Sequence, residues 1–443
     1  MQMTLPQPVR RALSMLSGEG FAAYAVGGCV RDMVLGTAPH DYDLCTAAMP
    51  EEMQRVFCQE RTLETGLKHG TLTVLMDGMP LEITTFRVDG DYTDHRHPDG
   101  VSFTRRVEDD LARRDLTINA MAYSPAEGLI DPFNGERDCR AGVIRCVGEP
   151  ERRFGEDALR ILRALRFSAR LGFPIEENTA KALREMRETL HAVSAERIAA
   201  ELNGLLIGKD AHGVLAEFPE VLFTVLPELS AMADCPQHCV YHDMDVWEHT
   251  LKAVEYSPRE PLLRWAALLH DCGKPKCHTR DAEEHDHFPS HQQAGAEMAR
   301  EMLHRLKMPA RVIDDVSELV RWHDTELAEK DMQWLLSQLG PEQTARLLQL
   351  RRADLLAHAP WVAREAEADY KALYEKMEAL LRDGACISLS QLAVNGRNVA
   401  ALGIRGPQIG ETLTRLLDMV TKDEAENDRE TLLRLAQREN QDV

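Results

Sequence analysis

The chain has 443 residues and a formal net charge of −21 at pH 7, and 44% of its residues are hydrophobic. This length predicts about two to four domains, each able to bury a core. No apolar run approaches the roughly 20 residues of a membrane span, and the N-terminus has no signal-peptide pattern, so we expect no membrane partner and a cytoplasmic location. Ten cysteines without framework spacing fit free thiols in a reducing compartment.

Arginines concentrate in one short part of this acidic chain. Residues 151–170 contain six arginines and three acidic residues. Phosphate binding draws on local Lys and Arg side chains, so a negative total charge does not exclude a nucleic-acid partner.

Residues 21–46 are the most informative stretch. They begin with an apolar run that predicts a buried strand. Gly27 and Gly28 then allow a close backbone approach, and residues 30–35 open a short helix whose amides can hold a phosphate oxygen. A second strand carries Asp41 and Asp43, which share a face because they are two residues apart. Carboxylates this close need a cation, and Mg²⁺ prefers oxygen ligands and phosphates. The combination indicates two-metal phosphoryl or nucleotidyl transfer, whereas each part alone indicates a turn or a solvated strand end.

The following segments continue the α/β pattern. The expected helices span residues 5–17 and 50–57, and the expected strands, joined by a turn at 77–80, span residues 71–76 and 81–87. Glu82 on the second strand either completes a carboxylate triad with Asp41 and Asp43 or faces solvent. Residues 88–105 are polar and contain Gly, His and Pro, which predicts a mobile loop rather than a core element.

Residues 112–122 place two arginines and an aspartate beside a helix-compatible apolar segment. Arg114 can bind a triphosphate, because guanidinium groups match phosphate oxygens, and Asp115 can accept a hydrogen bond from a ribose hydroxyl. A structural Arg–Asp pair is the alternative. Residues 131–138 then predict a turn-rich link into one more strand at 142–147.

From residue 150 onward the pattern is helical, so the change near residue 148 marks a domain boundary. The expected helices span residues 155–170, 176–190, 194–207 and 210–222. Four polar groups recur every three residues on one face of the first helix, namely Asp157, Arg160, Arg163 and Arg166.

Two of these side chains are able to select bases. Cytosine and adenine each present an amino donor beside a ring-nitrogen acceptor, whereas uracil and guanine present the reverse order. If Asp157 accepts from the amino group and Arg160 donates to the ring nitrogen, C and A are taken and U and G are refused. This predicts the use of CTP and ATP without a nucleic-acid template; a surface salt bridge is the alternative.

Residues 240–360 carry a second constellation of imidazoles and carboxylates. It comprises His249, the adjacent pair His270 and Asp271, His291, the pair His323 and Asp324, and Asp354. This donor set suits a divalent metal, although each residue alone is more often a helix histidine or a surface acid. Beyond it, a long charged helix is expected at 361–381 and two or three more at 389–440, whose glycine-rich turns either touch RNA or merely connect helices.

Five motifs follow the order found in class II CCA-adding tRNA nucleotidyltransferases, which this chain resembles. They are Gly27-Gly-x-Val-Arg-Asp with Asp41-x-Asp43, Arg113-Arg-Asp-x-Thr-Ile-Asn-Ala, the link 131–138, Glu156-Asp-x-x-Arg160, and residues 195–201. The resemblance covers roughly residues 20–205. It implies a mixed-sheet α/β head of the polymerase-β-like type, followed by an all-α neck, an HD domain and a helical tail. The expected boundaries are 1–147, 148–225, 226–360 and 361–443.

The resemblance also implies roles for individual residues. The tRNA 3′-hydroxyl attacks the α-phosphate of CTP twice and of ATP once. Asp41 and Asp43 would hold Mg²⁺, with Glu82 as a third carboxylate. The expected nucleotide contacts come from Gly28, Arg31, Arg114, Asp115, Asn119, Asp157, Arg160, Arg163 and Arg166. Poly(A) polymerases share the head motifs but tend to carry basic tails, so the acidic tail of this chain favours CCA addition. Family members that add only CC tend to lack the segment at 88–105, so its presence fits an enzyme that goes on to add A.

The second constellation resembles the HD phosphohydrolase superfamily. This implies His249, His270, Asp271 and Asp354 as ligands of a divalent metal of unknown identity, with His291 and His323 near the phosphate. The expected activity is hydrolysis of phosphate or 2′,3′-cyclic phosphate esters on tRNA ends. Two alternatives remain, a poly(A) polymerase or an HD hydrolase with a tRNA-binding head; the sequence indicates no oligomeric state.

Overall fold

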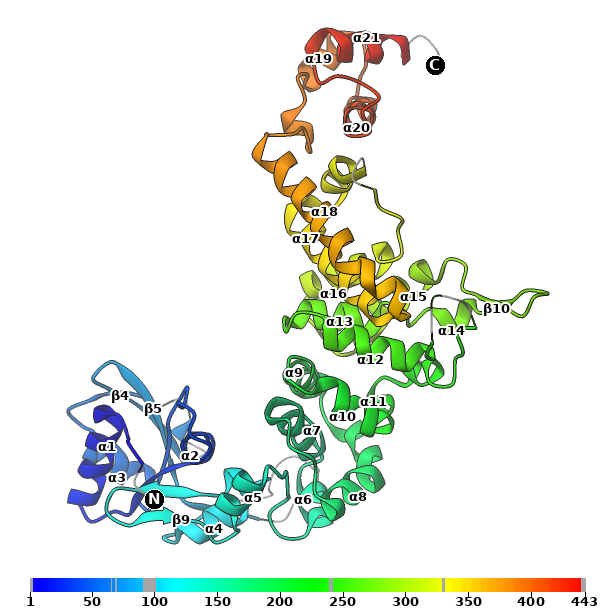
Figure 1. Ribbon diagram of the computed structural model, residues 1–443. Helices are drawn as coiled ribbons and strands as arrows, with labels where there is room; N and C mark the ends of the chain where they lie inside the picture. The colour runs from blue at the N-terminus through cyan, green and yellow to red at the C-terminus, as the bar shows by residue number, and fades with distance from the viewer. Residues whose placement is uncertain are drawn as a thin grey trace. The chain divides into compact units, whose positions relative to one another are not determined.

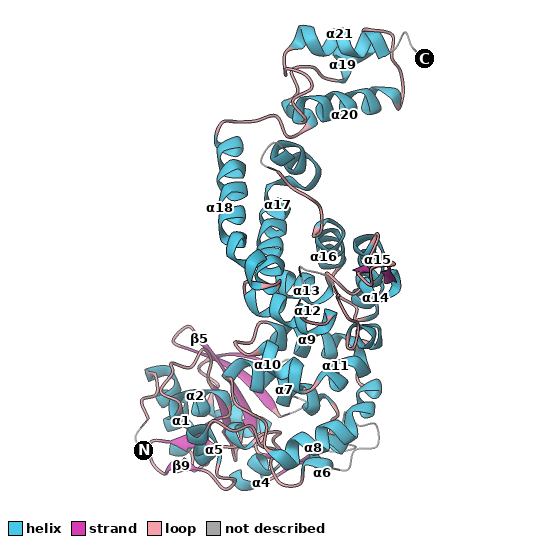
Figure 2. Cartoon of the chain, turned by 45° about the vertical axis from the view of Figure 1, so that its right-hand side comes forward, coloured by secondary structure: helices cyan, strands magenta, loops and turns pink. Residues whose placement is uncertain are grey.

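The computed structural model describes residues 3–64, 66–67, 70–90, 101–238, 241, 243–328 and 331–439. The chain forms two compact units, Met1–Ser230 and Ala231–Val443 (Figure 1). Strands concentrate in the first unit, and the second contains only the short β10–β11 pair among its described residues (Figure 2). This confirms the expected order of a mixed-sheet head followed by helices. No described helix combines the length and apolar character required to cross a bilayer.

The head is built on one seven-stranded sheet. The strand order is β3-β4-β5-β2-β1-β8-β9. Only β2 and β5 run parallel, while the other neighbours are antiparallel. The strands span β1 Ala23–Val26, β2 Asp43–Thr46, β3 Arg61–Leu63, β4 Thr71–Met76, β5 Met79–Thr85, β8 Ala122–Ser124 and β9 Gly128–Ile130.

The β4–β5 hairpin follows directly from the local sequence. Side chains alternate between buried and partly exposed along β4, as expected for a sheet with one face on a core. The turn is tighter than expected, because Met76 pairs with Met79 and only Asp77 and Gly78 lie between them. Both of these residues have positive φ, 49° and 85°, which matches the twist of a two-residue hairpin.

Helices cover the sheet and complete its core. They are α1 Gln7–Gly18, α2 Gly28–Val34, α3 Pro50–Val56, α4 Val107–Ala112 and α5 Gly135–Ala141. Tyr24 and Phe86 stack in a buried cluster that also includes Leu111 of α4 and Val147. The cluster joins strand β1 to the segments around the expected nucleotide-binding residues.

Three head segments differ from the sequence-based expectation. Residues 112–122 divide into the end of α4, the 3-10 helix η2 Thr117–Asn119 and the start of β8. The segment 131–138 begins α5, because the carboxylate of Asp131 accepts hydrogen bonds from the amides of Gly135 and Glu136. The predicted strand at 142–147 is wrong; this segment makes only isolated bridges through Ile144 and Cys146.

The ends of the predicted loop at 88–105 are paired. Strand β6, Arg87–Asp89, runs antiparallel to β7, Val101–Phe103, so these flanks form a separate two-stranded sheet. Thr104 also donates its amide to the carbonyl of Phe86, which ties this sheet to the head. Residues 91–100 of the predicted loop lie outside the described residues.

The neck is helical, as predicted, but the first helix is interrupted. Helix α6 ends at Glu156 and α7 begins at Leu159, with Asp157 in extended backbone at φ −141°. Asp157 Oδ1 accepts from the amide of Leu159, so this aspartate favours a new helix start over continuation of α6. The neck elements are α6 Pro150–Glu156, α7 Leu159–Leu171, α8 Glu177–Met186, η3 Arg187–Ala192, α9 Ala195–Leu206, α10 Ala211–Glu217 and α11 Pro219–Val225.

The second unit is a helical assembly with a separate small core near its end. Its main helices are α12 Val246–Tyr256, α13 Pro261–Leu269, α14 Lys274–Cys277, α15 His291–Arg305, α16 Ala310–Trp322, α17 Met332–Ala357 and α18 Pro360–Arg382. Helix α17 is kinked at Gly340, which has φ 73° and precedes Pro341. The short strands are β10 Thr279–Arg280 and β11 Asp286–His287.

The tail packs around its own apolar cluster. Leu392, Val394, Leu416 and Leu432 belong to this cluster. The elements are η6 Leu389–Gln391, α19 Gly396–Ala400, α20 Gln408–Thr421 and α21 Arg429–Glu439, while the 3-10 helix η4, Pro227–Met232, spans the boundary between the two units. Asn395 caps α19 by accepting from two amides. This supports the plain helix-connection interpretation of that glycine-rich turn.

Candidate functional site

Three carboxylates gather where β2 meets β5. Asp43 is the first residue of β2 and pairs in parallel register with Glu82 of β5, so their side chains leave the same face. Asp41 lies just before β2 rather than within it. Burial raises the pKa of Asp43, and the charges of Asp41 and Glu82 raise it further, against the opposing effect of Arg114. The charges of Asp41 and Glu82 are therefore close enough to Asp43 to disfavour its ionisation.

The donor set of these acids fits a hard cation. Within the described residues, none of the three carboxylates forms a salt bridge with a protein cation. Their oxygens also do not all lie within 4.8 Å of one another in the part of the head that the structure describes. A cation between two of them would therefore take other ligands from water or phosphate, as Mg²⁺ commonly does.

Gly27 and Gly28 lie against the guanidinium groups of two arginines. Gly27 precedes α2 with φ 76° and ψ −127°, a conformation that favours glycine. A Cβ at Gly27 would lie 3.0 Å from Nη1 of Arg114, whereas one at Gly28 would lie 3.6 Å from Nη2 of Arg31. The lack of a side chain therefore matters more at Gly27 than at Gly28, because it leaves room for the guanidinium group of Arg114.

Arg31 and Arg114 differ in how firmly the protein holds them. Arg31 is 3% exposed and donates to Asn119 Oδ1 at 2.8 Å and to Asp32 Oδ1 at 2.7 Å. Arg114 makes a longer contact, 3.3 Å from Nη2 to Asp110 Oδ2. Contact of Arg31 with a triphosphate thus requires it to exchange a partner, while Arg114 is less constrained.

Asp115 is paired with an arginine of the neck. Arg163 of α7 donates through Nε to Asp115 Oδ2 at 2.6 Å, and the amide of Leu116 donates to Oδ1 at 2.9 Å. Burial opposes ionisation of Asp115, but the charge and hydrogen bond of Arg163 outweigh it and lower the pKa of Asp115 to about 2. This carboxylate is therefore ionised and firmly positioned.

The predicted base-reading groups also have defined partners. Asp157 Oδ2 accepts from Arg197 Nη2 at 2.7 Å. Arg160 donates from Nη1 to Glu156 at 2.7 Å and from Nη2 to the carbonyl of Arg113 at 3.0 Å. Because α6 ends before Asp157, the predicted single face is wrong for this residue, although Arg160, Arg163 and Arg166 do share α7.

Arg166 belongs to the same set of ion pairs. Its Nε donates to Glu201 of α9 at 2.5 Å, and Arg163 lies 3.8 Å from the same carboxylate. Both guanidinium groups also lie over the ring of Phe167. The arginines of α7 therefore link the head, through Asp115, to α9 of the neck.

In the second unit, the four predicted metal ligands and the two histidines expected near the phosphate come together from five helices and their ends. They are His249 in α12, His270 and Asp271 after α13, His291 at the start of α15, His323 after α16, and Asp354 in α17. His249 Nε2 lies 2.9 Å from Asp354 Oδ1 and 3.4 Å from His270 Nε2. His270 Nε2 lies 3.1 Å from Asp271 Oδ2.

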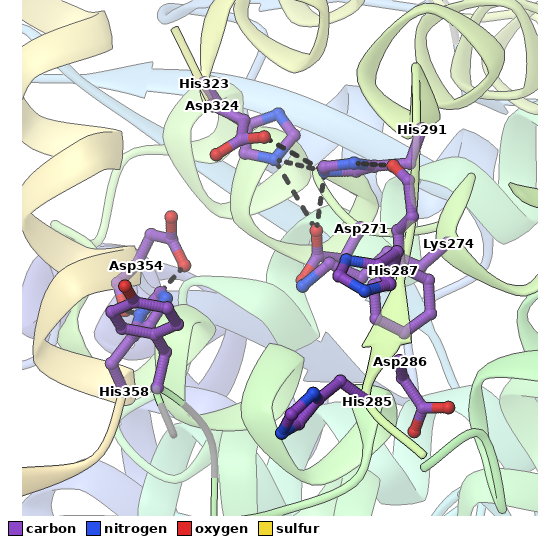
Figure 3. Close-up of a pocket in the computed structure, with 12 residues that line it drawn as sticks. Asp271, Lys274, His285, Asp286, His287, His291, His323, Asp324, Asp354 and His358 are labelled. Carbon is purple, nitrogen blue, oxygen red and sulfur yellow. Dashed lines mark hydrogen bonds and ion pairs between the residues drawn. The ribbon is translucent and has the colours of Figure 1, made fainter. Parts of the chain in front are cut away.

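Asp271 faces a different group of histidines with each oxygen. Its Oδ2 belongs to the group with His249 and His270, while Oδ1 lies 3.5 Å from Nε2 of both His291 and His323. In Figure 3, Asp271, His291 and His323 meet on one side of the pocket, and Asp354 and His358 lie on the other. Two sets of ligand atoms therefore share one carboxylate.

The protein orients the four imidazoles through their other nitrogens. In each ring Nδ1 lies against a backbone carbonyl, that of Ala357, Ala267, Phe288 or Val320, at 2.7–3.3 Å. An Nδ1–H that donates to such a carbonyl leaves Nε2 as the ligand atom, and it fixes the orientation of the ring. All four Nε2 atoms are consequently directed at the two carboxylates.

The electrostatics of this cluster favour a bound cation. Asp271 is 1% exposed, and its Oδ2 lies 2.8 Å from Lys274 Nζ and 3.1 Å from His270 Nε2. Burial opposes its charge, yet His270 and Lys274 keep the pKa of Asp271 well below its usual value. Burial likewise disfavours the charged imidazole of His270, but Asp271 raises the pKa of His270 to about 10. Without metal, a proton on His270 therefore partly neutralises the acids, and a metal ion would replace it.

A cavity of about 540 Å³ opens over these ligands. Asp271, His291, His323, Asp354, His358 and Lys274 line it, together with Tyr241, Phe288 and residues of the β10–β11 hairpin. Lys274 lies 2.8 Å from Asp271 Oδ2 and donates to Gln237. The cavity is thus large enough for a small substrate and has both metal ligands and a cation in its wall.

Several residues of these sites were not predicted from the sequence. In the first unit they are Asp110, Arg197 and Glu201, and in the second Lys274 and His358. Arg197 and Glu201 lie in the quoted motif 195–201, and Lys274 follows His270-Asp271 by three residues, so a signal existed for these. No sequence signal pointed to Asp110, because its carboxylate meets Arg113 and Arg114 through the local fold at the end of α4.

Three protein families match successive parts of the chain. The family described as "Poly A polymerase head domain" matches residues 23–145, "Probable RNA and SrmB- binding site of polymerase A" matches 172–232, and "HD domain" matches 240–359. The carboxylates and glycines of the head lie within the first match. The four predicted metal ligands of the second unit, and also His291 and His323, lie within the last.

Similar proteins extend over nearly the whole chain. The CCA-adding enzyme of Geobacillus kaustophilus (strain HTA426) is 33% identical over 434 residues, which is 96% of each chain. That of Enterococcus faecalis (strain ATCC 700802 / V583) is 31% identical over 450 residues, 98% of this chain and 97% of its own. A crystal structure of the Bacillus stearothermophilus CCA-adding enzyme in complex with CTP superposes with a TM-score of 0.75 at 28% identity, covering 99% of both chains. With the head carboxylates, the arginines of the neck and the coverage in agreement, this chain belongs to the family of CCA-adding enzymes, which are tRNA nucleotidyltransferases.

Proposed function

We propose that the chain completes the 3′ end of tRNA by adding C, C and A from CTP and ATP, without a nucleic-acid template. In each step the terminal 3′-oxygen forms a bond to the α-phosphorus of the nucleotide. The bond from that phosphorus to the oxygen bridging the α- and β-phosphates breaks, and pyrophosphate leaves. When bound, Mg²⁺ would favour deprotonation of the 3′-hydroxyl and neutralise charge on the leaving group.

The observation that carries this proposal is the parallel pairing of Asp43 with Glu82, with Asp41 beside them. These acids supply oxygen ligands for a cation on the exposed face of the sheet. Arg114 is near enough to affect the ionisation of Asp43, which supports a role for it in contacting the nucleotide phosphates. Asn119 and Asp115, held by Arg31 and Arg163, would contact the sugar.

The neck would read the incoming base. Asp157 accepts from the exocyclic amino group of cytosine or adenine, and Arg160 donates to the adjacent ring nitrogen. To do so, Arg160 exchanges its contact with the Arg113 carbonyl for the base, while Glu156 keeps its other end in place. Uracil and guanine would leave the partly buried Asp157 and the buried Arg160 without a partner on the base, which disfavours them.

One assay separates this proposal from its alternatives. A tRNA that lacks CCA is supplied with radiolabelled CTP alone, ATP alone or both, using the full chain. CCA addition gives two C residues with CTP alone and the complete end with both nucleotides. Incorporation of A without C would indicate a poly(A) polymerase instead. Incorporation of neither would leave the head as a tRNA-binding module and contradict the proposal.

The carboxylates are tested by isosteric substitution. Asp41→Asn and Asp43→Asn should each abolish incorporation, because an amide cannot replace an anionic ligand. Asp77→Asn is the matched control, since Asp77 lies in the exposed β4–β5 turn and its ion pair is with Arg11, also exposed. Equal activity of Asp43→Asn and the control would exclude metal binding by Asp43.

For the second unit, we propose hydrolysis of phosphate esters at RNA ends, with 2′,3′-cyclic phosphates as one class. Water forms a bond to phosphorus, one ribose oxygen leaves, and that oxygen takes a proton. The two ligand sets that share Asp271 support a centre with two divalent ions. His249, His270 and Asp354 would complete the first set. His291 and His323 would bring the second ion to the phosphate, in keeping with their expected place beside it.

Metal content tests this centre independently of activity. In a full chain that carries Asp41→Asn and Asp43→Asn, so that the head holds no metal, exhaustive exchange into a solution of one divalent metal should leave two ions per chain. His291→Ala should retain one, and Asp271→Ala should retain none, because it removes the shared carboxylate. His304→Ala, at the exposed end of α15, is the control and should retain both. Loss of cyclic phosphate hydrolysis should follow the loss of metal.

We also propose that the protein acts in the cytoplasm. The nine cysteines that the structure describes are all free thiols, which a reducing cytoplasm preserves.

A further inference from the structure

Two aromatic side chains lie exposed side by side in the second unit. Tyr241 is 52% and Trp361 51% exposed, and their ring centroids are 5.4 Å apart at an interplanar angle of 40°. Because the rings are tilted, neither covers the other completely. Exposing two adjacent aromatic rings to water costs free energy, so such a pair indicates a surface that binds a ligand.

The pair is attached to the wall of the metal cavity. Tyr241 is itself one of the residues that line the cavity. Its carbonyl accepts from the amide of Ala359 at 2.9 Å, and Ala359 directly follows His358, which groups with His249 and Asp354. Trp361 is the second residue of α18. A few residues of chain therefore connect the metal ligands to the aromatic pair.

The remaining lining shows what kind of molecule the cavity suits. Ten of its twelve residues are His, Asp or Lys, and the other two are Tyr241 and Phe288. A cavity with ionisable groups and cation ligands at its base and an aromatic surface at its edge is suited to a phosphate ester that carries a flat apolar group. A wholly apolar partner surface would bury those charges without pairing them.

We propose that Tyr241 and Trp361 form a stacking surface for a nucleobase, which makes the second site selective for phosphate esters of nucleosides, such as a terminal RNA nucleotide. The inference rests on the hydrolase activity proposed above. Every base has a flat face, so stacking accepts all four bases and discriminates only against esters that lack a base. Stacking also requires no positive charge, in keeping with the strongly acidic chain.

The test compares two cyclic phosphates that differ in the base. The full chain, loaded with a divalent metal, is assayed with adenosine 2′,3′-cyclic phosphate and with glycerol 1,2-cyclic phosphate. Trp361→Leu and Tyr241→Leu should each lower the preference for the nucleoside ester, measured as the ratio of kcat/KM values, by about ten-fold, mainly through KM. Tyr256→Leu is the control, because Tyr256 is 42% exposed in the same unit and does not line the cavity.

An unchanged ratio in both variants would overturn the proposal. This includes the case in which kcat/KM falls equally for the two esters, which would indicate a general effect on the site. Circular dichroism checks that the variants are folded. If these residues instead contact a protein partner, the ratio stays unchanged, so this outcome also counts against the nucleobase.

A second measurement separates failure of the inference from failure of the hydrolase. If the wild-type chain hydrolyses neither ester with any divalent metal, the proposed activity is wrong, but binding still tests the stacking surface. Adenosine 3′-monophosphate should quench tryptophan fluorescence in the wild type, and Trp361→Leu should remove that quenching. Equal quenching in the variant would show that the base does not lie on Trp361.

Discussion

Arg197 of α9 donates a hydrogen bond of 2.7 Å to Asp157, which lies between α6 and α7. The contact fixes one oxygen of the carboxylate that we expect to read the base. Arg197→Leu should therefore reduce discrimination of CTP against UTP by about ten-fold, because a loosely held carboxylate accepts either base edge. Single-nucleotide incorporation with each triphosphate measures this ratio.

Two variants define what the Arg197 result means. Arg197→Lys retains a donor and should recover part of the discrimination. Arg184→Leu removes a similar partly exposed pair, between Arg184 of α8 and Glu220 of α11, and should change neither rate nor selectivity. A uniform loss of rate for all nucleotides in Arg197→Leu would indicate a structural role only.

Gly27→Ala should impair nucleotide binding more than other glycine substitutions. It combines an unfavourable φ of 76° with a Cβ only 3.0 Å from Arg114 Nη1, so backbone strain of about 1–3 kcal/mol is joined by displacement of that arginine. We expect KM for CTP to rise about ten-fold or more. Gly20→Ala shares the positive φ, 83°, but its Cβ meets nothing within 4 Å. Comparable KM values for the two variants would contradict the role assigned to Arg114.

Asp115 should make the first unit sensitive to acid. Its pKa is lowered to about 2 in the folded chain from an ordinary value of 3.8, so the ionised form stabilises the fold above about pH 4. This contribution, about 2.5 kcal/mol, is lost as the pH falls from about 4 to about 2. Asp115→Asn should lower the free energy of unfolding by that amount at pH 7 and by progressively less below pH 4.

Two spectroscopic probes distinguish unfolding of the first unit, which contains Asp115, from unfolding of the second. All five tryptophans lie in residues 231–443, so their fluorescence follows the second unit in urea, and far-ultraviolet circular dichroism adds the first. Asp115→Asn should shift only the unfolding transition that circular dichroism detects and tryptophan fluorescence does not. Asp77→Asn, an exposed pair with Arg11, should shift stability by less than about 1 kcal/mol.

Glu82→Gln should weaken magnesium binding in the head. Because Glu82 lies beside Asp43 in the parallel register, its loss should raise the Mg²⁺ concentration for half-maximal incorporation by about ten-fold to a hundred-fold. Saturating Mg²⁺ should restore much of the rate. Glu108→Gln, at an exposed pair on α4, serves as the control. A variant with a normal Mg²⁺ requirement would make Glu82 a solvent-facing strand residue, the alternative considered from the sequence.

The sequence predicted those parts of the fold that local patterns determine. Alternation of apolar residues placed β4 correctly at residues 71–76, and the periodicity of the neck placed most of its helices to within a few residues. The single helix expected at 210–222 is instead two, α10 and α11. The interruption at Asp157 was missed, because an aspartate that caps one helix start is indistinguishable in periodicity from one within a helix. The prediction of a strand at 142–147 was wrong for a related reason. An apolar run predicts that a segment is buried, but it does not predict which segment it forms hydrogen bonds with.

Ligand identities were more predictable than ligand grouping. His249, His270, Asp271 and Asp354 do meet, but no spacing could show that the two oxygens of Asp271 face separate sets of histidines. That division depends on how α13, α15 and α16 approach one another. In the head, the neighbour relation of Asp43 and Glu82 likewise depends on β5 pairing in parallel with β2 across an intervening hairpin.

Five helices supply the side chains that converge on Asp271 and Asp354. Ions seated there would join segments more than a hundred residues apart in the chain, such as His249 and Asp354, in the way that a covalent cross-link does. Heat resistance of residues 231–443 would then follow the supply of metal, and a chelator would loosen this half of the protein while leaving the fold of the head intact.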